Sequence, residues 1–187
     1  GNYNPKYTFG ISNTFKYKNW SLGFLIDGKI GGVIASGTAG QFAYAGTSEA
    51  TLKYREGNWV IPAVKADGSK NTTPVNAEQF WQTVAQGDYN WGEFFTYDAS
   101  NIRLRELSLG YEFSKLPTVL KSVKVSLFAR NLFFIYRGNA ILDIPGMSKR
   151  KMDFDPEVSF GNSNYQGIEY YNLPSTRSIG INCKLTF

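Results

Sequence analysis

The stretch Ser175-Thr-Arg-Ser-Ile-Gly-Ile-Asn-Cys-Lys-Leu-Thr-Phe187 decides the fold, because its side chains alternate in polarity. Its odd positions from Ile179 to Phe187 are apolar, and its even positions from Thr176 to Thr186 are polar or glycine. A period of two residues predicts a β-strand between two different environments. An apolar series at a chain end has little to pack against in a soluble protein. It suits a strand of an outer-membrane β-barrel, which faces lipid on one side and the lumen on the other.

The same alternation recurs near the start of the chain. Residues 6–18 and 20–27 are separated only by a turn at Lys18-Asn19, and this arrangement predicts a β-hairpin. Tyrosine and tryptophan stand at the ends of its apolar face, where the aromatic girdle of a membrane barrel lies. The apolar side chains are Tyr7, Phe9, Ile11, Phe15 and Tyr17 in the first strand and Trp20, Leu22, Phe24 and Ile26 in the second.

A second hairpin is predicted over residues 100–135. Its strands are residues 100–113 and 121–135, and residues 114–120 form the turn. The apolar parity changes within the first strand, so we expect a β-bulge near Arg105-Glu106 to restore one continuous apolar face. On all five strands we expect that face to point outward into lipid, in particular at Phe24, Leu109, Ile181 and Leu185.

Two long segments separate these strands. Residues 31–97 begin with a small, flexible stretch, and then predict a short strand at Thr51–Arg55 and a flap over residues 59–69. Asn76 to Ala85 is the one helix that the pattern supports, with Asn76 as its N-cap. The second long segment is residues 136–174. Membrane barrels have short periplasmic turns and long extracellular loops, so we expect both long segments to be extracellular and Phe187 to be periplasmic.

Composition excludes several classes of protein. The 187 residues include no His and a single Cys, which removes the usual general base, an intramolecular disulfide and a cysteine zinc site. No apolar run reaches the roughly 18 residues of a transmembrane helix. The formal net charge is +5, but Lys and Arg are scattered along the chain, so we expect no nucleic-acid partner. The start at Gly1 resembles no signal peptide, so we expect a mature protein or a piece of one.

About five spanning strands are too few to close a membrane barrel, which needs about eight, and open edges are not tolerated in lipid. We therefore expect residues 1–187 to be the C-terminal segment of a larger transmembrane β-barrel, with the plug and earlier strands elsewhere. A freestanding β-sandwich is the alternative. The one-sided apolar faces and the apolar terminus argue against it.

An ordered series of motifs resembles the C-terminal part of the SusC-like TonB-dependent transporters of the Bacteroidetes outer membrane. The resemblance covers essentially the whole chain, although each motif alone is weak. The motifs, in chain order, are Asn4-Pro5-Lys-Tyr-Thr-Phe-Gly10, Ile102-Arg-Leu-Arg-Glu-Leu-Ser-Leu-Gly-Tyr111, Ala129-Arg-Asn-Leu132, Asp155-Pro-Glu157, Pro174-Ser-Thr-Arg-Ser-Ile-Gly180 and the terminal Phe187.

This resemblance implies an all-β fold within a plugged barrel of about 22 strands. It implies import of oligosaccharides or peptides with a SusD-like surface lipoprotein as the lid and with energy supplied through TonB. The plug and the TonB contact would lie outside this segment. We expect no cofactor. An enzyme is a third hypothesis, and we expect no enzyme activity because the sequence offers no nucleophile or acid–base set. The alternative is a non-transporting outer-membrane barrel whose long loops bind a partner, and a plug domain upstream would decide between the two.

Three sets of residues are candidate sites. An aromatic cluster in the first long segment suits stacking on sugar rings or contact with the lid, while packing within the loop is the other interpretation. Three alternating acidic residues are a weak calcium candidate, with a polar turn or paired catalytic carboxylates as alternatives. The final strand resembles the signal read by the barrel-assembly machinery. These sets are, respectively, Trp81, Tyr89, Trp91, Phe94, Phe95 and Tyr97; Asp153, Asp155 and Glu157; and Ile179, Ile181, Leu185 and Phe187.

Overall fold

A computed structural model describes residues 1–86, 92–114, 119–159 and 166–187. The chain divides into two compact units, each made of three separate segments. We call residues 5–31, 100–137 and 175–187 the sheet unit, and residues 1–4, 32–99 and 138–174 the loop unit.

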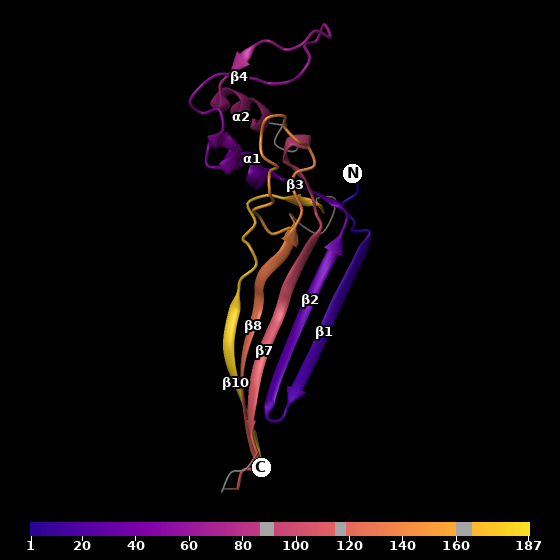
Figure 1. Ribbon diagram of the computed structural model, residues 1–187, viewed down its shortest axis with the longest axis vertical. Coiled ribbons are helices and arrows are strands. Elements are labelled where there is room, and N and C mark those ends of the chain that lie inside the picture. The colour runs from indigo at the N-terminus through magenta and orange to yellow at the C-terminus, as the bar shows by residue number, and fades with distance from the viewer. Residues whose placement is uncertain (87–91, 115–118, 160–165) are drawn as a thin grey trace. The chain divides into compact units, whose positions relative to one another are not determined.

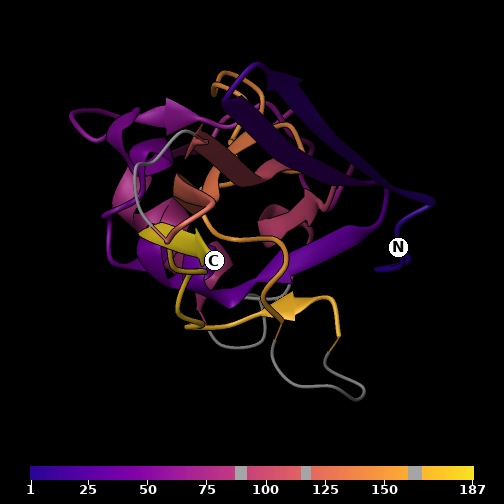
Figure 2. The same ribbon diagram turned by 90° about the horizontal axis from the view of Figure 1, so that it is seen from below.

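The sheet unit is one antiparallel sheet of five long strands (Figure 1). Its spatial order is β1-β2-β7-β8-β10, and neither β1 nor β10 pairs with a second strand among the described residues. β1 and β2 lie side by side through the two-residue turn at Lys18-Asn19 (Figure 1 and Figure 2). The all-β prediction is confirmed, and the sheet is open. The strands are β1 (Tyr7–Tyr17), β2 (Trp20–Ile30), β7 (Asn101–Phe113), β8 (Ser122–Arg137) and β10 (Ser178–Thr186).

The register of the five strands brings their apolar residues into rows. Leu22 pairs with Phe15 on one side and with Leu109 on the other, Leu109 pairs with Leu127, and Leu127 pairs with Ile181. A neighbouring row contains Tyr17, Trp20, Tyr111, Val125 and Cys183. A slip of one residue in any strand would turn that strand over, so this register fixes one apolar face across the whole sheet.

The predicted β-bulge is confirmed at Arg105. Leu25 pairs with Glu106 and Ile26 with Leu104, so Arg105 is the extra residue between two consecutive pairs. On β8, two residues, Asn131 and Leu132, stand opposite Arg105. Asn131 adopts a left-handed backbone with φ of 52°. The bulge absorbs the change of parity, and the apolar residues on both sides of it stay on one face.

The loop unit contains short elements around the only hydrophobic core found among the described residues. Its helices α1 and α2 contact each other, and the core residues include Trp59, Phe80, Trp81, Phe95 and Met152. No helix formed by the described residues is long and apolar enough to cross a membrane. The elements are β3 (Val33–Ser36), α1 (Gly37–Tyr44), a 3-10 turn (Glu49–Leu52), β4 (Trp59–Val60), β5 (Pro74–Val75), α2 (Ala77–Ala85), a 3-10 turn (Glu93–Phe95), β6 (Thr96–Asp98) and β9 (Ile168–Glu169).

Predictions for the loop unit were right in part. The helix α2 and its N-cap are confirmed, because the Asn76 Oδ1 accepts a hydrogen bond of 2.6 Å from the Gln79 N–H. The predicted strand at Thr51–Arg55 is wrong, since a 3-10 turn occupies Glu49–Leu52. The stretch interpreted as flexible contains β3 and α1, and Ser36 caps α1 by accepting from the Ala39 N–H at 3.0 Å.

Candidate functional site

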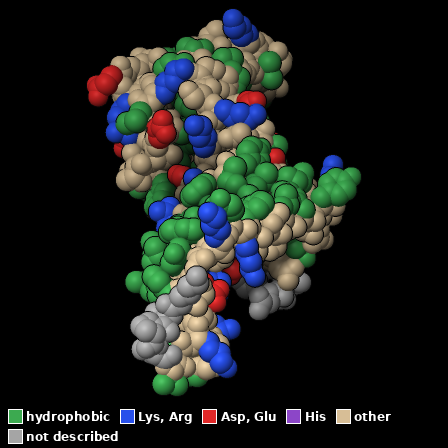
Figure 3. All heavy atoms as spheres, turned by 60° about the horizontal axis from the view of Figure 1, so that its bottom comes forward, with side chains coloured by type: hydrophobic (Ala, Val, Ile, Leu, Met, Phe, Trp, Pro, Cys, Tyr) green, Lys and Arg blue, Asp and Glu red, His purple; other side chains and the backbone are tan. Residues whose placement is uncertain are grey.

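The apolar face of the sheet unit consists of the rows described above. Its side chains are open to the surroundings, with exposed fractions of 44% for Leu109, 70% for Ile181 and 50% for Leu185. Phe24 is half-buried by its neighbours in the sheet. These four residues therefore do not meet in a shared dry interior. Figure 3 shows hydrophobic side chains gathered over the strands in a broad area. An exposed apolar surface of this kind requires an apolar phase or a partner.

Aromatic rings gather at the hairpin-turn end of the apolar face. The rings of Trp20 and Tyr111 lie 4.8 Å apart at their centroids, and those of Tyr111 and Phe113 also lie 4.8 Å apart. Tyr17 pairs with Trp20 in the same row. Tyr7 stands at the opposite end of β1. Amphipathic rings near the ends of an apolar band are typical of the interface girdles of a membrane barrel.

The opposite face of the sheet is polar, and it contains ion pairs. The Arg105 guanidinium donates to the Asp27 Oδ2 through Nη2 at 2.7 Å and through Nε at 2.9 Å, and Nη1 donates to the Asn131 Oδ1 at 3.2 Å. Arg130 lies 3.2 Å from a Glu106 carboxylate oxygen. The bulge at Arg105 thus places its side chain in a charged network across β2, β7 and β8.

The predicted assembly signal lies on β10. Its residues Ile179, Ile181, Leu185 and Phe187 are exposed by 50–78%. β10 pairs with β8 from Ser178 to Thr186, and in the described residues no strand pairs with its other edge. An unpaired edge with one apolar face is a template for strand addition. The role of these residues in assembly stays a prediction.

The predicted aromatic cluster divides between the core and undescribed positions. Tyr89 and Trp91 lie outside the described residues. Trp81, Phe95 and Tyr97 are buried, and Phe94 is half-buried. Phe80 joins the cluster, with ring centroids 5.1 Å from Trp81 and 5.9 Å from Phe94. The four described members therefore pack within the loop unit, and their contact with a substrate or a lid stays a prediction.

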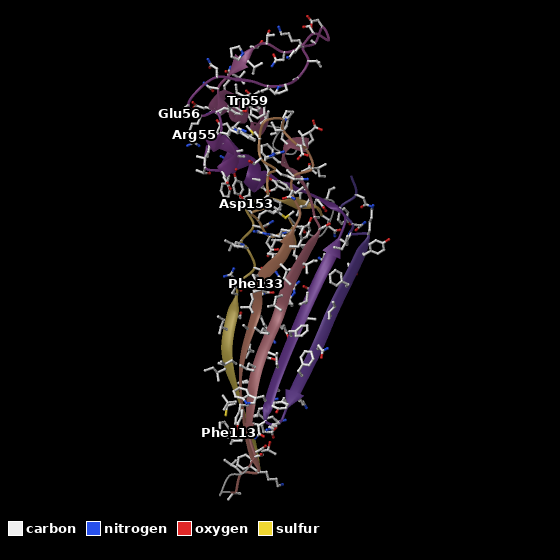
Figure 4. All side chains as sticks on the ribbon, viewed as in Figure 1. Arg55, Glu56, Trp59, Phe113, Phe133 and Asp153 are labelled. Atoms are coloured by element: carbon white, nitrogen blue, oxygen red, sulfur yellow. The ribbon has the colours of Figure 1, made fainter. Side chains whose placement is uncertain are left out.

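The three acidic residues of the calcium hypothesis form a turn instead of a ligand set. Asp153 is exposed, as Figure 4 shows, while Asp155 is buried. The Asp155 Oδ1 accepts a hydrogen bond of 3.0 Å from the Glu157 N–H, which is an Asx-turn. Across the described parts of the chain, no group of three or more His, Cys, Asp or Glu side chains is arranged to hold a metal ion. The geometry agrees with the polar-turn alternative.

A buried carboxylate that the sequence did not single out connects β9 with α1. Glu169 is 2% exposed and accepts hydrogen bonds from the Ser36 hydroxyl at 2.5 Å and, on its other oxygen, from the Thr38 hydroxyl at 2.6 Å. The Asn172 N–H donates to the same oxygen as Thr38, at 3.3 Å. With Asp153 and Asp155, Glu169 lines a cavity of about 240 Å³. Glu169 belongs to a strand of two residues, so no periodicity marks it in the sequence.

Burial also shifts the pKa values of Tyr97 and Arg150 in the loop unit. Burial raises the pKa of Tyr97 to about 12; nearby Arg150 opposes this shift, and Asp153 and Glu169 add to it. Burial lowers the pKa of Arg150 below its usual range. The Arg150 guanidinium donates to the carbonyl of Leu142 at 2.9 Å and to that of Phe94. The bond to Phe94 joins the aromatic segment to the second long segment.

Comparison with known proteins gives one curated relative. No family model matches the chain. The "TonB-dependent receptor P3" of Formosa agariphila is 25% identical over 195 residues, which cover 98% of this chain and 17% of that receptor. The chain therefore spans about a sixth of the length of the relative that it matches.

Among solved structures, one match shows a similar fold. The RagAB peptide importer in its open-open state matches with a TM-score of 0.51 at 17% identity, over 98% of this chain and 17% of that one. The closed-closed state matches with a TM-score of 0.46 at 21% identity, over 72% of this chain and 14% of that one. The first match confirms the predicted all-β fold class.

Proposed function

We propose that this chain, which is a segment of a SusC-like TonB-dependent transporter, forms part of the barrel wall of an outer-membrane importer. The observation that carries the proposal is the register of the five strands. It aligns exposed apolar rows on one face, and the paired charges of Arg105 and Asp27 lie on the other. A wall between lipid and a polar lumen requires these two faces.

The free edges of the sheet support the same proposal. An edge strand in lipid leaves backbone N–H and C=O groups without partners, which costs several kcal/mol for each group. β1 and β10 would therefore pair with further strands of the same barrel. Residues 1–187 would be its C-terminal segment, and the plug and the TonB contact would belong to the rest of the transporter. Phe187 would then lie on the periplasmic side.

The loop unit would be the extracellular part of this segment. Its two long segments, residues 32–99 and 138–174, are inserted between strands whose turns at the other end are short. A folded core within such loops gives a rigid surface for a SusD-like lipoprotein lid and for an oligosaccharide or peptide substrate. RagAB is a peptide importer, and its match supports a peptide substrate as one of the two classes. Trp81, Phe94, Phe95 and Tyr97 would support this surface from within.

A pair of substitutions on adjacent residues of β1 tests the proposal. Ile11 is on the apolar face and Ser12 on the polar face, and both are exposed. In the full-length transporter, Ile11→Lys places a charge in lipid at a cost of about 2–4 kcal/mol near the midplane, whereas Ser12→Lys places it in the lumen. We expect Ile11→Lys to lower the level of folded barrel in the outer membrane severalfold, measured by heat-modifiable gel mobility and surface labelling. Equal levels for the two variants would exclude a lipid-facing role for this face.

A further inference from the structure

The two-residue turn between β1 and β2 ends the apolar face of the sheet unit with polar groups (Figure 1). Tyr17 and Trp20 flank the turn, pair with each other, and are exposed by 70% and 50%. The Lys18 ammonium lies 5.4 Å from the centroid of the Tyr17 ring. Because Tyr17 belongs to the apolar face, this contact places the charge of Lys18 at the margin of that face.

Three side-chain donors at this turn are available to an acceptor outside the chain. Within the described residues, the Tyr17 hydroxyl, the Lys18 ammonium and the Trp20 indole N–H make no hydrogen bond and no ion pair. The backbone that carries them is tied to β7. The Glu112 N–H donates to the Asn19 carbonyl at 2.9 Å, and the Asn19 side-chain amide donates to the Glu112 carbonyl. The turn therefore holds the three donors close together at a fixed place.

The end of the sheet unit that contains this turn is basic. We define the turn end as residues 16–21, 110–114, 119–126 and 182–187, and Glu112 is the one acidic side chain in these ranges. Glu112 pairs with Lys124 and lies between two apolar-face residues of β7, so its side chain belongs to the polar face. An excess of positive charge beside the apolar face attracts an anion. The lysines of the turn end are Lys16, Lys18, Lys121, Lys124 and Lys184.

We propose that Lys18, Tyr17 and Trp20 bind the phosphate of an anionic phospholipid headgroup. The exposed apolar rows run along the sheet from Tyr17 and Trp20, and Lys18 adds a cation at their end. A ligand for this place must combine apolar chains with an adjacent anion, as a phospholipid does, whereas an acidic protein segment has no acyl chains to cover the rows. Lysine and amphipathic rings suit the headgroup depth of a membrane. The inference rests on the proposed barrel wall, in which this end faces the periplasmic leaflet.

Trp20 can itself report the lipid that lies beside it. The full-length transporter is placed in nanodiscs of phosphatidylcholine and phosphatidylglycerol, and one lipid at a time carries brominated acyl chains, which quench tryptophan fluorescence on contact. The difference between the transporter and Trp20→Phe isolates the signal of Trp20. The ratio of the two quenching efficiencies gives the preference for phosphatidylglycerol at this place. We expect a preference of about fivefold at low salt, which 1 M salt largely removes by screening the charge of Lys18.

Two lysines of β1 and its turn give the variant and its matched control. Lys18→Gln removes the charge at the apolar margin and should abolish the preference for phosphatidylglycerol, whereas Lys18→Arg should keep it. Lys16→Gln removes the same charge from the polar face, where Lys16 pairs with Ser21, and should leave the preference unchanged. Heat-modifiable gel mobility checks that each variant is folded.

The outcomes separate this inference from the barrel wall on which it rests. Equal quenching by the two lipids in the unchanged transporter, or an equal loss of preference in Lys16→Gln and Lys18→Gln, would overturn the phospholipid site and leave the barrel wall standing. If neither lipid quenches Trp20, this face does not meet lipid, and both proposals are wrong.

Discussion

Asn131 shows how one residue supports the bulge. Its backbone lies in the left-handed region, with φ of 52°. Its side chain accepts a hydrogen bond from Arg105 at 3.2 Å and donates to the carbonyl of Thr176, also at 3.2 Å. Asparagine tolerates this conformation better than other residues with a side chain, because its amide bonds locally. The residue therefore links β7, β8 and the segment that leads into β10.

Substitution of Asn131 separates its backbone role from its side-chain role. Asn131→Ala should lower the free energy of unfolding by about 1–2 kcal/mol, since it adds backbone strain to the loss of both hydrogen bonds. Asn131→Gly loses the same bonds without the strain, and should cost less. Urea unfolding of the full-length transporter in detergent, followed by tryptophan fluorescence, gives both values. If the two variants are equally stable, the left-handed backbone carries no cost.

The raised pKa of Tyr97 predicts that the folded protein loses stability at alkaline pH. Its pKa is raised to about 12 in the folded protein, from an ordinary value of 10, mainly because burial disfavours the phenolate. Below pH 10 both states keep the proton, so the stability is complete. Between pH 10 and 12 the unfolded chain ionises first, and stability falls with rising pH. Tyr97→Phe should show a smaller fall between pH 10 and 12, measured by local hydrogen exchange in the loop unit. An identical fall in both proteins would show that Tyr97 is not responsible.

At the scale of elements, α2 depends on its N-cap. Asn76→Ala removes the acceptor of the Gln79 N–H and should reduce the local stability of α2 by about 1 kcal/mol. Hydrogen exchange of the amides of residues 77–85, in the full-length transporter, reports this stability directly. Asn76→Asp keeps an acceptor and is the matched control, with exchange close to that of the unchanged protein. Faster exchange in both variants would point to a different role for Asn76.

The long strands were predictable from the sequence because a period of two residues over nine or more positions is a strong local signal. The bulge was also predictable, since one extra residue at Arg105 rejoins the apolar face that the change of parity interrupts. Helix α1 was not. Its sequence Gly37-Thr-Ala-Gly-Gln-Phe-Ala-Tyr44 contains two glycines, which disfavour a helix. It forms because Ser36 caps it and because Ala39 and Ala43 are buried against the rest of the loop unit.

The candidate sites were less predictable than the strands, for a physical reason. Aromatic residues stabilise a core and bind ligands through the same surfaces, so the sequence alone leaves both roles open for Trp81 and Phe95. Their burial appears only in the folded loop unit. The buried Glu169 depends on partners more than 130 positions away, Ser36 and Thr38, and no local pattern reveals such a pair. Long-range contacts of this kind define the cavity that Glu169 lines.

At the scale of the whole molecule, the end of the chain carries a prediction about assembly. Phe187 follows the apolar series of β10 and is 70% exposed. We expect deletion of Phe187, or Phe187→Lys, to lower insertion of the barrel more than it lowers ligand affinity, because the assembly hypothesis takes the apolar face of β10 and Phe187 as the surface that strand addition reads. Surface labelling gives the amount inserted, and titration of the purified protein gives the affinity. Thr186→Lys, on the polar face, is the control. A normal surface level of Phe187→Lys would contradict this expectation.

The uneven pairing opposite Arg105 limits which strand segments can be exchanged between related chains. Two residues of β8 stand opposite one residue of β7. Beyond this point, paired residues of the two strands therefore differ by one in their distance along the chain from the turn. Removing Leu132 alone would rotate the remainder of β8 by half a turn. Phe133 would then lie on the polar face of the sheet. Phe134, whose ring centroid now lies 3.9 Å from the Arg103 guanidinium carbon, would lie on the apolar face. A hairpin exchanged between two related chains keeps one continuous apolar face only if Arg105 is exchanged together with Asn131 and Leu132.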